Sequence, residues 1–162
     1  MKVSIIVAVY KDVKVLELIF ETLSYQTYKN FEVIVAEDGN SQEMQSYIDI
    51  ARKKYNFEIK HTTQEDKGIR KARSQNNGIL AANGEYLIFI DGDCLLYSTF
   101  IEGHVKLSKK NQALSGRRLN LTEDLTRKIK LKKIKPIDIE KNLLSKYIYL
   151  AFDKEVRFEQ GI

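Results

Sequence analysis

The order of short strand-like runs is the feature that most restricts the fold of this chain. Four runs rich in β-branched and aromatic residues alternate with segments whose apolar residues recur at helical spacing. The expected strands are Val3–Val9, Phe31–Ala36, Phe57–His61 and Tyr86–Ile90. The expected helices between them are Val13–Tyr25, Gln42–Tyr55 and Ile69–Ala82, with Asp12 and Ser41 as N-caps of the first two. This order predicts an α/β fold with a mostly parallel central sheet flanked by helices.

The pattern is weaker after the fourth strand. A helix is expected over Ser98–Lys109, a strand over Ala113–Arg118 and a basic helix over Asp124–Lys133, which Pro136 ends. A last helix is expected over Ile139–Phe152. Its apolar residues near Leu143 to Phe152 leave a hydrophobic face that would favour a homo-oligomer.

Polar residues follow three of the predicted strands at the point where each ends. They are Tyr10–Asp12, Glu37–Ser41 and Asp91–Asp93. In parallel α/β sheets, ligands bind outside the carboxyl ends of the strands. Because unrelated turns would rarely agree in this way, the three strand ends together predict a binding site.

The run Tyr86–Ile90 ends in Asp91-Gly92-Asp93, which carries the most chemical information. A buried strand does not usually end in two acids, because a desolvated carboxylate needs a partner. Two oxygen ligands there suit Mg²⁺ or Mn²⁺ that holds a diphosphate, and Gly92 allows a turn and a close approach of the ligand. The alternative is that Asp-Gly is only a turn after a strand.

The helix expected from Ile69 begins beside Gly68 and carries Arg70, Lys71 and Arg73 in its first turns. Cations there oppose the helix dipole, which indicates an anion that both the backbone amides and the side chains contact. Gly68, Arg70 and Arg73 are therefore candidate substrate-binding residues. A solvated basic turn is the alternative.

Composition limits the class of protein. The chain has 162 residues, one cysteine, two histidines and a net charge of +5, with no apolar run of membrane-spanning length and no signal peptide. A single cysteine fits a cytoplasmic protein and, with two histidines, gives no zinc site.

The basic stretch Arg127–Lys135 suits a peripheral contact with the inner face of the plasma membrane, or is only a solvated face. Nucleic-acid recognition motifs are missing, so nucleic acid is not an expected partner.

Several stretches resemble the bacterial polysaccharide branch of the family 2 glycosyltransferases, which have the GT-A nucleotide-diphospho-sugar transferase fold, a Rossmann-like arrangement. The stretches are Ser4–Tyr10, Ser24–Tyr28, Phe31–Ser41, Gln64–Arg73 with Asn76 and Gly78, Gly84–Cys94 and Ser115–Arg118. The resemblance implies a nucleotide-sugar-binding core over residues 1–118. Residues 119–162 would be a helical, basic and incomplete acceptor-side region.

The resemblance also implies roles for single residues around the nucleotide. Ala8, Val9 and Tyr10 would line the base, and Asp38 would accept a hydrogen bond from uracil with Glu37 beside it. The implied donor is therefore a UDP-sugar.

Around the diphosphate, the resemblance implies that Arg70 reaches the base or the phosphates and that Asn76 supports this wall. Asp91 would bind the ribose or the metal, and Asp93 would hold the divalent cation. The implied acceptor is a polysaccharide or a lipid-linked glycan.

The chain departs from the family in its C-terminal part, where the acceptor half and the catalytic base of relatives have no match. Glu102, Asp124, Asp138, Glu140, Asp153, Glu155 and Glu159 lack a motif that would single one out as the base, and His104 is a ligand or a core residue. Two alternatives stay open. One is a non-catalytic binding or scaffold module. The other is a sugar nucleotidyltransferase, although that class carries a glycine-rich basic loop after the first strand and this chain does not.

Overall fold

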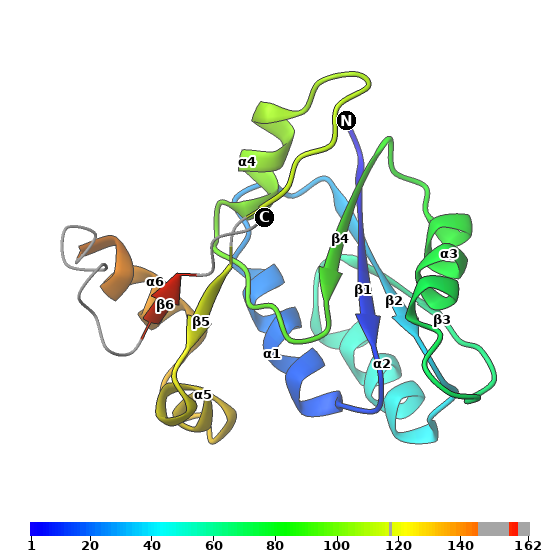
Figure 1. Cartoon of the computed structure of the whole chain (residues 1–162), viewed down its shortest axis with the longest axis horizontal. Helices are drawn as coiled ribbons and strands as arrows, with labels where there is room; N and C mark the ends of the chain where they lie inside the picture. The colour runs from blue at the N-terminus through cyan, green and yellow to red at the C-terminus, as the bar shows by residue number, and fades with distance from the viewer. Residues whose placement is uncertain (117, 146–155, 159–162) are drawn as a thin grey trace.

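Four parallel strands form the central sheet, in the order β3-β2-β1-β4 (Figure 1). The structure is a computed structural model that describes residues 1–116, 118–145 and 156–158. The strands are β1 (Val3–Val9), β2 (Phe31–Glu37), β3 (Glu58–Thr62) and β4 (Tyr86–Asp91). Ala8 of β1 lies opposite both Ala36 of β2 and Asp91 of β4, so the carboxyl ends of these strands meet at one edge of the sheet.

Helices cover both faces of the sheet, as the sequence predicts. They are α1 (Val13–Ser24), α2 (Gln42–Lys54), α3 (Lys71–Ala81) and α4 (Phe100–Leu107). The alternate residues Val3, Ile5, Val7 and Val9 pack with α1, α2 and α4 in the main core. Ile6, from the opposite face of β1, packs under the end of α3. The predicted caps are confirmed, because Asp12 accepts a hydrogen bond from the amide of Val15, and Ser41 accepts one from the amide of Met44.

A buried carboxylate fastens the start of β4 to the centre of the sheet. Glu32 accepts hydrogen bonds from Ser4 Oγ at 2.7 Å and from the amide of Asn83 at 2.5 Å, and Lys2 and Lys60 lie 3.1 and 3.0 Å from its second oxygen. Burial by itself raises the pKa of Glu32, but these donors outweigh it and hold the pKa at about 2. The amide of Gly84 in turn donates to Ser4 Oγ, so the chain that enters β4 is tied to β1.

The region after α4 differs from the sequence prediction in one strand. Residues 112–116 and 118 are irregular, and the strand expected over Ala113–Arg118 is wrong in the described part of it. The strand is instead β5 (Leu119–Leu121), which pairs antiparallel with β6 (Val156–Phe158) in a separate sheet. Apart from a half-buried Leu114, the described side chains from Ala113 to Gly116 are exposed, so this stretch has no apolar face to bury.

Two short helices follow β5. Helix α5 (Glu123–Lys130) begins one residue earlier than predicted, after a cap by Thr122, and helix α6 (Pro136–Ser145) begins at the proline itself. Proline suits the first helical position because its missing N–H would have no partner there. The rest of the helix predicted to Phe152, and the side chains of the proposed oligomer face from Leu143 onward, lie outside the described residues. Across the described ranges, no helix is both long and apolar enough to cross a bilayer.

Candidate functional site

A cavity of about 1580 Å³ lies at the carboxyl ends of β1 and β4 and extends along β4 toward α5 and α6. Its lining includes eight of the candidate site residues, seven at strand ends and Gly68 before α3. They are Ala8, Val9, Tyr10, Asp38, Gly68, Asp91, Gly92 and Asp93. The predicted convergence of the strand ends is therefore present.

Asp38 is a buried carboxylate whose position is fixed by two donors. Its Oδ1 accepts a hydrogen bond from Gln64 Nε2 at 2.5 Å, and its Oδ2 accepts one from the amide of Arg70 at 2.6 Å. Asn77 Nδ2 donates to Gln64 Oε1 at 3.4 Å and supports that arrangement. Each carboxylate oxygen can accept a second hydrogen bond, so Asp38 remains able to bind a ligand N–H group.

Glu37 does not reach the cavity, although the sequence pairs it with Asp38. Its side chain is fully buried, where it accepts a hydrogen bond from the amide of Ser41 and lies 2.9 Å from His61 Nε2. Burial lowers the pKa of His61, and the Glu37 carboxylate opposes this shift. Glu37 thus holds the start of α2 against β3 and is not placed to bind a substrate.

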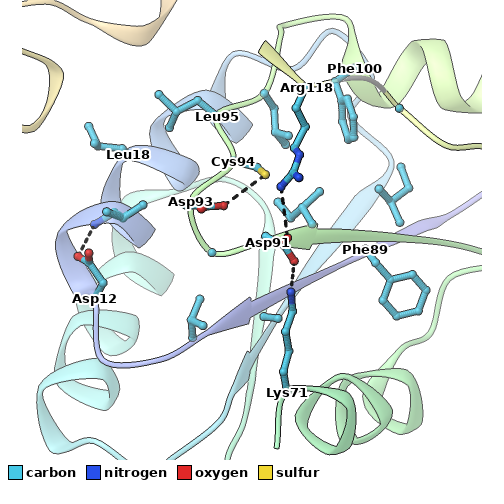
Figure 2. Close-up of a pocket in the computed structure, with 18 of the residues that line it drawn as sticks. Asp12, Leu18, Lys71, Phe89, Asp91, Asp93, Cys94, Leu95, Phe100 and Arg118 are labelled. Carbon is cyan, nitrogen blue, oxygen red and sulfur yellow. Dashed lines mark hydrogen bonds and ion pairs between the residues drawn. The ribbon is translucent and has the colours of Figure 1, made fainter. Parts of the chain in front are cut away.

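Asp91 and Asp93 frame the turn after β4 at the cavity wall (Figure 2). Asp91 pairs with Lys71 through one oxygen and lies 3.8 Å from Arg118 through the other. Asp93 accepts a weak hydrogen bond from the thiol of Cys94 at 3.6 Å, and burial together with the Asp93 charge raises the pKa of that thiol.

The two aspartates fit a small hard cation that also takes oxygens from its substrate. Within the described residues, no group of three or more His, Cys, Asp or Glu side chains is placed to hold a metal. Mg²⁺ and Mn²⁺ commonly use one or two carboxylates and complete their shell with phosphate and water. Two carboxylates beside an open cavity match that kind of site.

Gly92 is required for a reason that the sequence did not supply. A Cβ atom at this position would lie 2.6 Å from the carbonyl oxygen of Ala8. The close approach is therefore that of the β1 backbone, whereas the sequence led us to expect the approach of a ligand.

The basic start of α3 is divided between the cavity and the solvent. Lys71 and Ser74 line the cavity, whereas Arg73 and Asn76 are exposed and lie outside its lining. The helical period explains this, because residues three apart share a face and residues 73 and 76 lie on another. Asn77, rather than Asn76, supports the Asp38 wall.

Arg70 contributes to the site through its backbone. Its amide binds Asp38, while its guanidinium donates to the carbonyl of Glu65 in the preceding loop. Gly68 in that loop has a φ of +69°, a conformation that favours glycine. The loop is thus shaped to present the Arg70 amide to Asp38.

Tyr10 forms an exposed wall at the end of β1. The residue is 53% exposed, its hydroxyl lies 3.4 Å from Asp66, and Lys11 Nζ lies 4.6 Å from the ring centroid. Asp66 also pairs with Lys11 at 2.7 Å and raises the pKa of that lysine. The ring offers a flat surface on which a planar ligand could stack.

The sequence assigns no role to Gln64 or Glu140. It names Lys71 only as part of the basic start of the helix, and Arg118 only as part of a stretch that carries the family resemblance. Glu140 of α6 is buried and accepts hydrogen bonds from the amide and hydroxyl of Ser98, at 2.8 and 2.6 Å. Only the tertiary fold brings α6 to that loop, so no local pattern could have found it.

His104 is a packing residue beside Phe100, with its Nδ1 3.2 Å from the Tyr86 hydroxyl.

The family model described as "Glycosyl transferase family 2" matches residues 4–159. The chain belongs to this family. Over 110 residues it is 32% identical to an uncharacterized glycosyltransferase of Rickettsia felis, covering 68% of this chain and 18% of that protein. It is 34% identical over 104 residues to the cholesterol galactosyltransferase of Borreliella burgdorferi, covering 62% of this chain and 27% of that protein. This family 2 chain therefore spans less than a third of the length of either relative.

Two solved structures share the fold. TarS of S. aureus (residues 1–349, in complex with UDP-GlcNAc) superimposes with a TM-score of 0.55 at 23% identity, covering 65% of this chain and 30% of that one. The mannosyltransferase PcManGT of Pyrobaculum calidifontis, in complex with GDP-Man and Mn²⁺, gives a TM-score of 0.53 at 20% identity, covering 58% and 28%. These likenesses confirm the predicted α/β fold of the GT-A type.

Proposed function

We propose that this chain is the donor-binding part of a glycosyltransferase that takes a UDP-sugar. The carrying observation is that one cavity brings together Asp38, the exposed ring of Tyr10 and the Asp91–Asp93 pair at adjoining strand ends. These groups offer what a nucleoside diphosphate can use: a hydrogen-bond acceptor and a flat stacking surface for the base, and a place for the charged phosphates.

Asp38 is the proposed base-recognition residue. Its two donors leave the carboxylate fixed in position and able to accept a further hydrogen bond from the ring N–H of uracil. Guanine also carries ring and exocyclic N–H donors, and PcManGT is bound to GDP-Man. The test therefore includes GDP beside UDP.

Asp91 and Asp93 are the proposed holders of Mg²⁺ or Mn²⁺. Such an ion neutralises the charge that develops on the leaving nucleoside diphosphate. In this proposal the protein orients the donor, and the sugar passes to a polysaccharide or lipid-linked glycan acceptor. Deprotonation of the acceptor hydroxyl would require a carboxylate base, which we do not assign to any described residue.

The scaffold alternative depends on the basic stretch Arg127–Lys135, whose cations are partly neutralised. Arg127 and Lys128 pair with Asp124, and Lys132 pairs with Glu17 at 3.0 Å. Paired cations attract an anionic surface less strongly. We therefore rank donor binding first and keep a peripheral contact at the inner face of the membrane as a secondary proposal.

Calorimetric titration of UDP and GDP, each with and without Mn²⁺, tests the proposal. We expect UDP to bind in a Mn²⁺-dependent manner and Asp93→Ala to weaken that binding at least about tenfold, because the metal loses a carboxylate ligand. Asp49→Ala is the matched control, since Asp49 is an exposed acid on α2 that pairs with Arg52 outside the cavity.

The outcomes separate the hypotheses. Metal-dependent binding of GDP in place of UDP would overturn the assignment of uracil to Asp38. A folded protein that binds neither nucleotide would overturn the donor-binding proposal and favour the scaffold role.

A further inference from the structure

Asp91 lies between two cations, Lys71 and Arg118, that approach its carboxylate from opposite sides (Figure 2). Lys71 is the first residue of α3, and Arg118 lies in the segment just before β5. Lys71 is the nearer of the two and engages Oδ1 directly. A divalent cation that uses this oxygen as a ligand therefore competes with, and is repelled by, an ammonium group that already binds it.

The Lys71–Asp91 pair is exposed enough for Lys71 to change its partner, and it contributes little to the stability of the fold. The Lys71 side chain is 49% exposed and that of Asp91 is 41% exposed. Ion pairs with such access to solvent add little to the free energy of folding. Lysine also carries its charge on a flexible stem, so the ammonium can move to a new partner without a change in the backbone.

The partner available to a displaced Lys71 is the anionic part of the donor. Lys71, Gly68 and Asp93 line the same cavity as Asp91. A diphosphate that reaches Asp91 and Asp93 through a metal therefore enters the space next to the Lys71 ammonium, which is attracted to phosphate oxygens.

We propose that Lys71 is an exchangeable counterion of the donor site, bound to Asp91 in the free protein and transferred to the diphosphate when the metal–nucleotide complex binds. This inference rests on the proposed donor-binding function. It assigns Lys71 two opposite effects: it competes with the metal for Asp91, and it helps to bind the nucleotide. The protein would then take up the metal together with the nucleotide in preference to the metal alone.

Opposite effects on two titrations distinguish this role from a structural one. With Lys71→Met, we expect Mn²⁺ to bind the nucleotide-free protein about fivefold more tightly, because its competitor is gone. At saturating Mn²⁺, we expect UDP to bind about fivefold more weakly, because the diphosphate loses a cation. A residue that only anchored the start of α3 would weaken both.

The experiment is a Mn²⁺ titration followed by electron paramagnetic resonance and a UDP titration by calorimetry, on the full chain. Lys67→Met is the matched control, since Lys67 is an exposed lysine in the loop before α3 that lies outside the cavity lining. It removes the same charge, so any general electrostatic effect appears in both variants. Lys71→Arg keeps the charge and is expected to keep UDP binding closer to wild type than Lys71→Met does.

Each contrary result has a distinct meaning. If wild type shows metal-dependent UDP binding but Lys71→Met matches Lys67→Met in both titrations, the counterion role is overturned and the donor site stands. If Lys71→Met weakens both titrations, Lys71 is a structural anchor. If wild type binds no UDP at all, the donor-site proposal and this inference fail together.

Discussion

At the scale of single residues, the turn between Asp91 and Asp93 depends on the absence of one side chain. The carbonyl oxygen of Ala8 lies 2.6 Å from the place of a Cβ at Gly92, a distance that real Cβ atoms do not show. Backbone lies on both sides of this contact, so neither partner can rotate away. The separation between β1 and the aspartate turn is thus set by Gly92.

Gly92→Ala should therefore damage the site more than the fold. We expect the displaced turn to weaken Mn²⁺-dependent UDP binding about tenfold or more, and the free energy of unfolding to fall by about 1–3 kcal/mol from overpacking. Calorimetry and urea unfolding measure the two effects. Gly103→Ala is the control, because a Cβ at Gly103 in α4 meets nothing within 4 Å. Unchanged UDP affinity in Gly92→Ala would show that the turn can shift without cost to the site.

The sequence predicted the carboxylates of the site better than their surroundings. Asp38, Asp91 and Asp93 line the cavity. Their place at the ends of strands could be predicted because an apolar run shows where its strand ends. Glu37 was misplaced because β2 is buried on both faces, so no alternation of polar and apolar residues indicates which of two adjacent acids faces the ligand.

At the scale of whole elements, the connection from α1 to β2 fixes the loop that follows Asp93. Gln26 is fully buried, and its Nε2 donates to the carbonyls of Tyr97 and Thr22, at 2.7 and 3.3 Å. Its Oε1 accepts from the amide of Ile101 at 3.1 Å. One side chain therefore joins the end of α1 to the loop and to the first turn of α4.

Gln26→Leu should release that loop from α1. The buried amide of Ile101 loses its acceptor, and the carbonyls of Tyr97 and Thr22 each lose one donor. We therefore expect the free energy of unfolding to fall by about 1–3 kcal/mol. The amide of Ile101 should also exchange its hydrogen faster, since it loses its acceptor. Gln42→Leu, at an exposed position at the start of α2, should change neither quantity. An Ile101 amide that stays as protected as in wild type would contradict the role of Gln26.

Elements with their own apolar pattern were predictable, and elements that depend on distant partners were not. The first four strands and three helices lie within two residues of their expected bounds, because each buries a periodic face. The expected strand at Ala113–Arg118 failed because pairing needs a neighbour. The neighbour of β5 is β6, which no local pattern near residue 120 reveals.

At the scale of the whole molecule, few of the described side chains of the C-terminal helices are buried against the core. Leu125 and Ile129 of α5 pack on Leu18 of α1 in a small cluster separate from the main core. Glu140 of α6 adds its hydrogen bonds to Ser98. The cavity runs between this attachment and β4, so the helices form one wall of the candidate site.

This arrangement predicts that α5 opens without unfolding of the sheet. Few buried contacts give a low free energy of local opening, and β1 and β2 are buried along their whole length. Native-state hydrogen exchange should therefore give a smaller opening free energy for the amides of α5 than for those of β1 and β2.

Leu125→Ala tests whether the small cluster alone sets that difference. Removing its buried methyl groups should lower the opening free energy of α5 by about 2 kcal/mol, while the protection of β1 and β2 stays unchanged. Leu131→Ala is the matched control, because Leu131 at the end of α5 is 59% exposed. If Leu125→Ala lowers protection in β1 and β2 by the same amount as in α5, the chain unfolds as one cooperative unit. The C-terminal wall of the cavity would then open only when the donor-binding sheet itself unfolds.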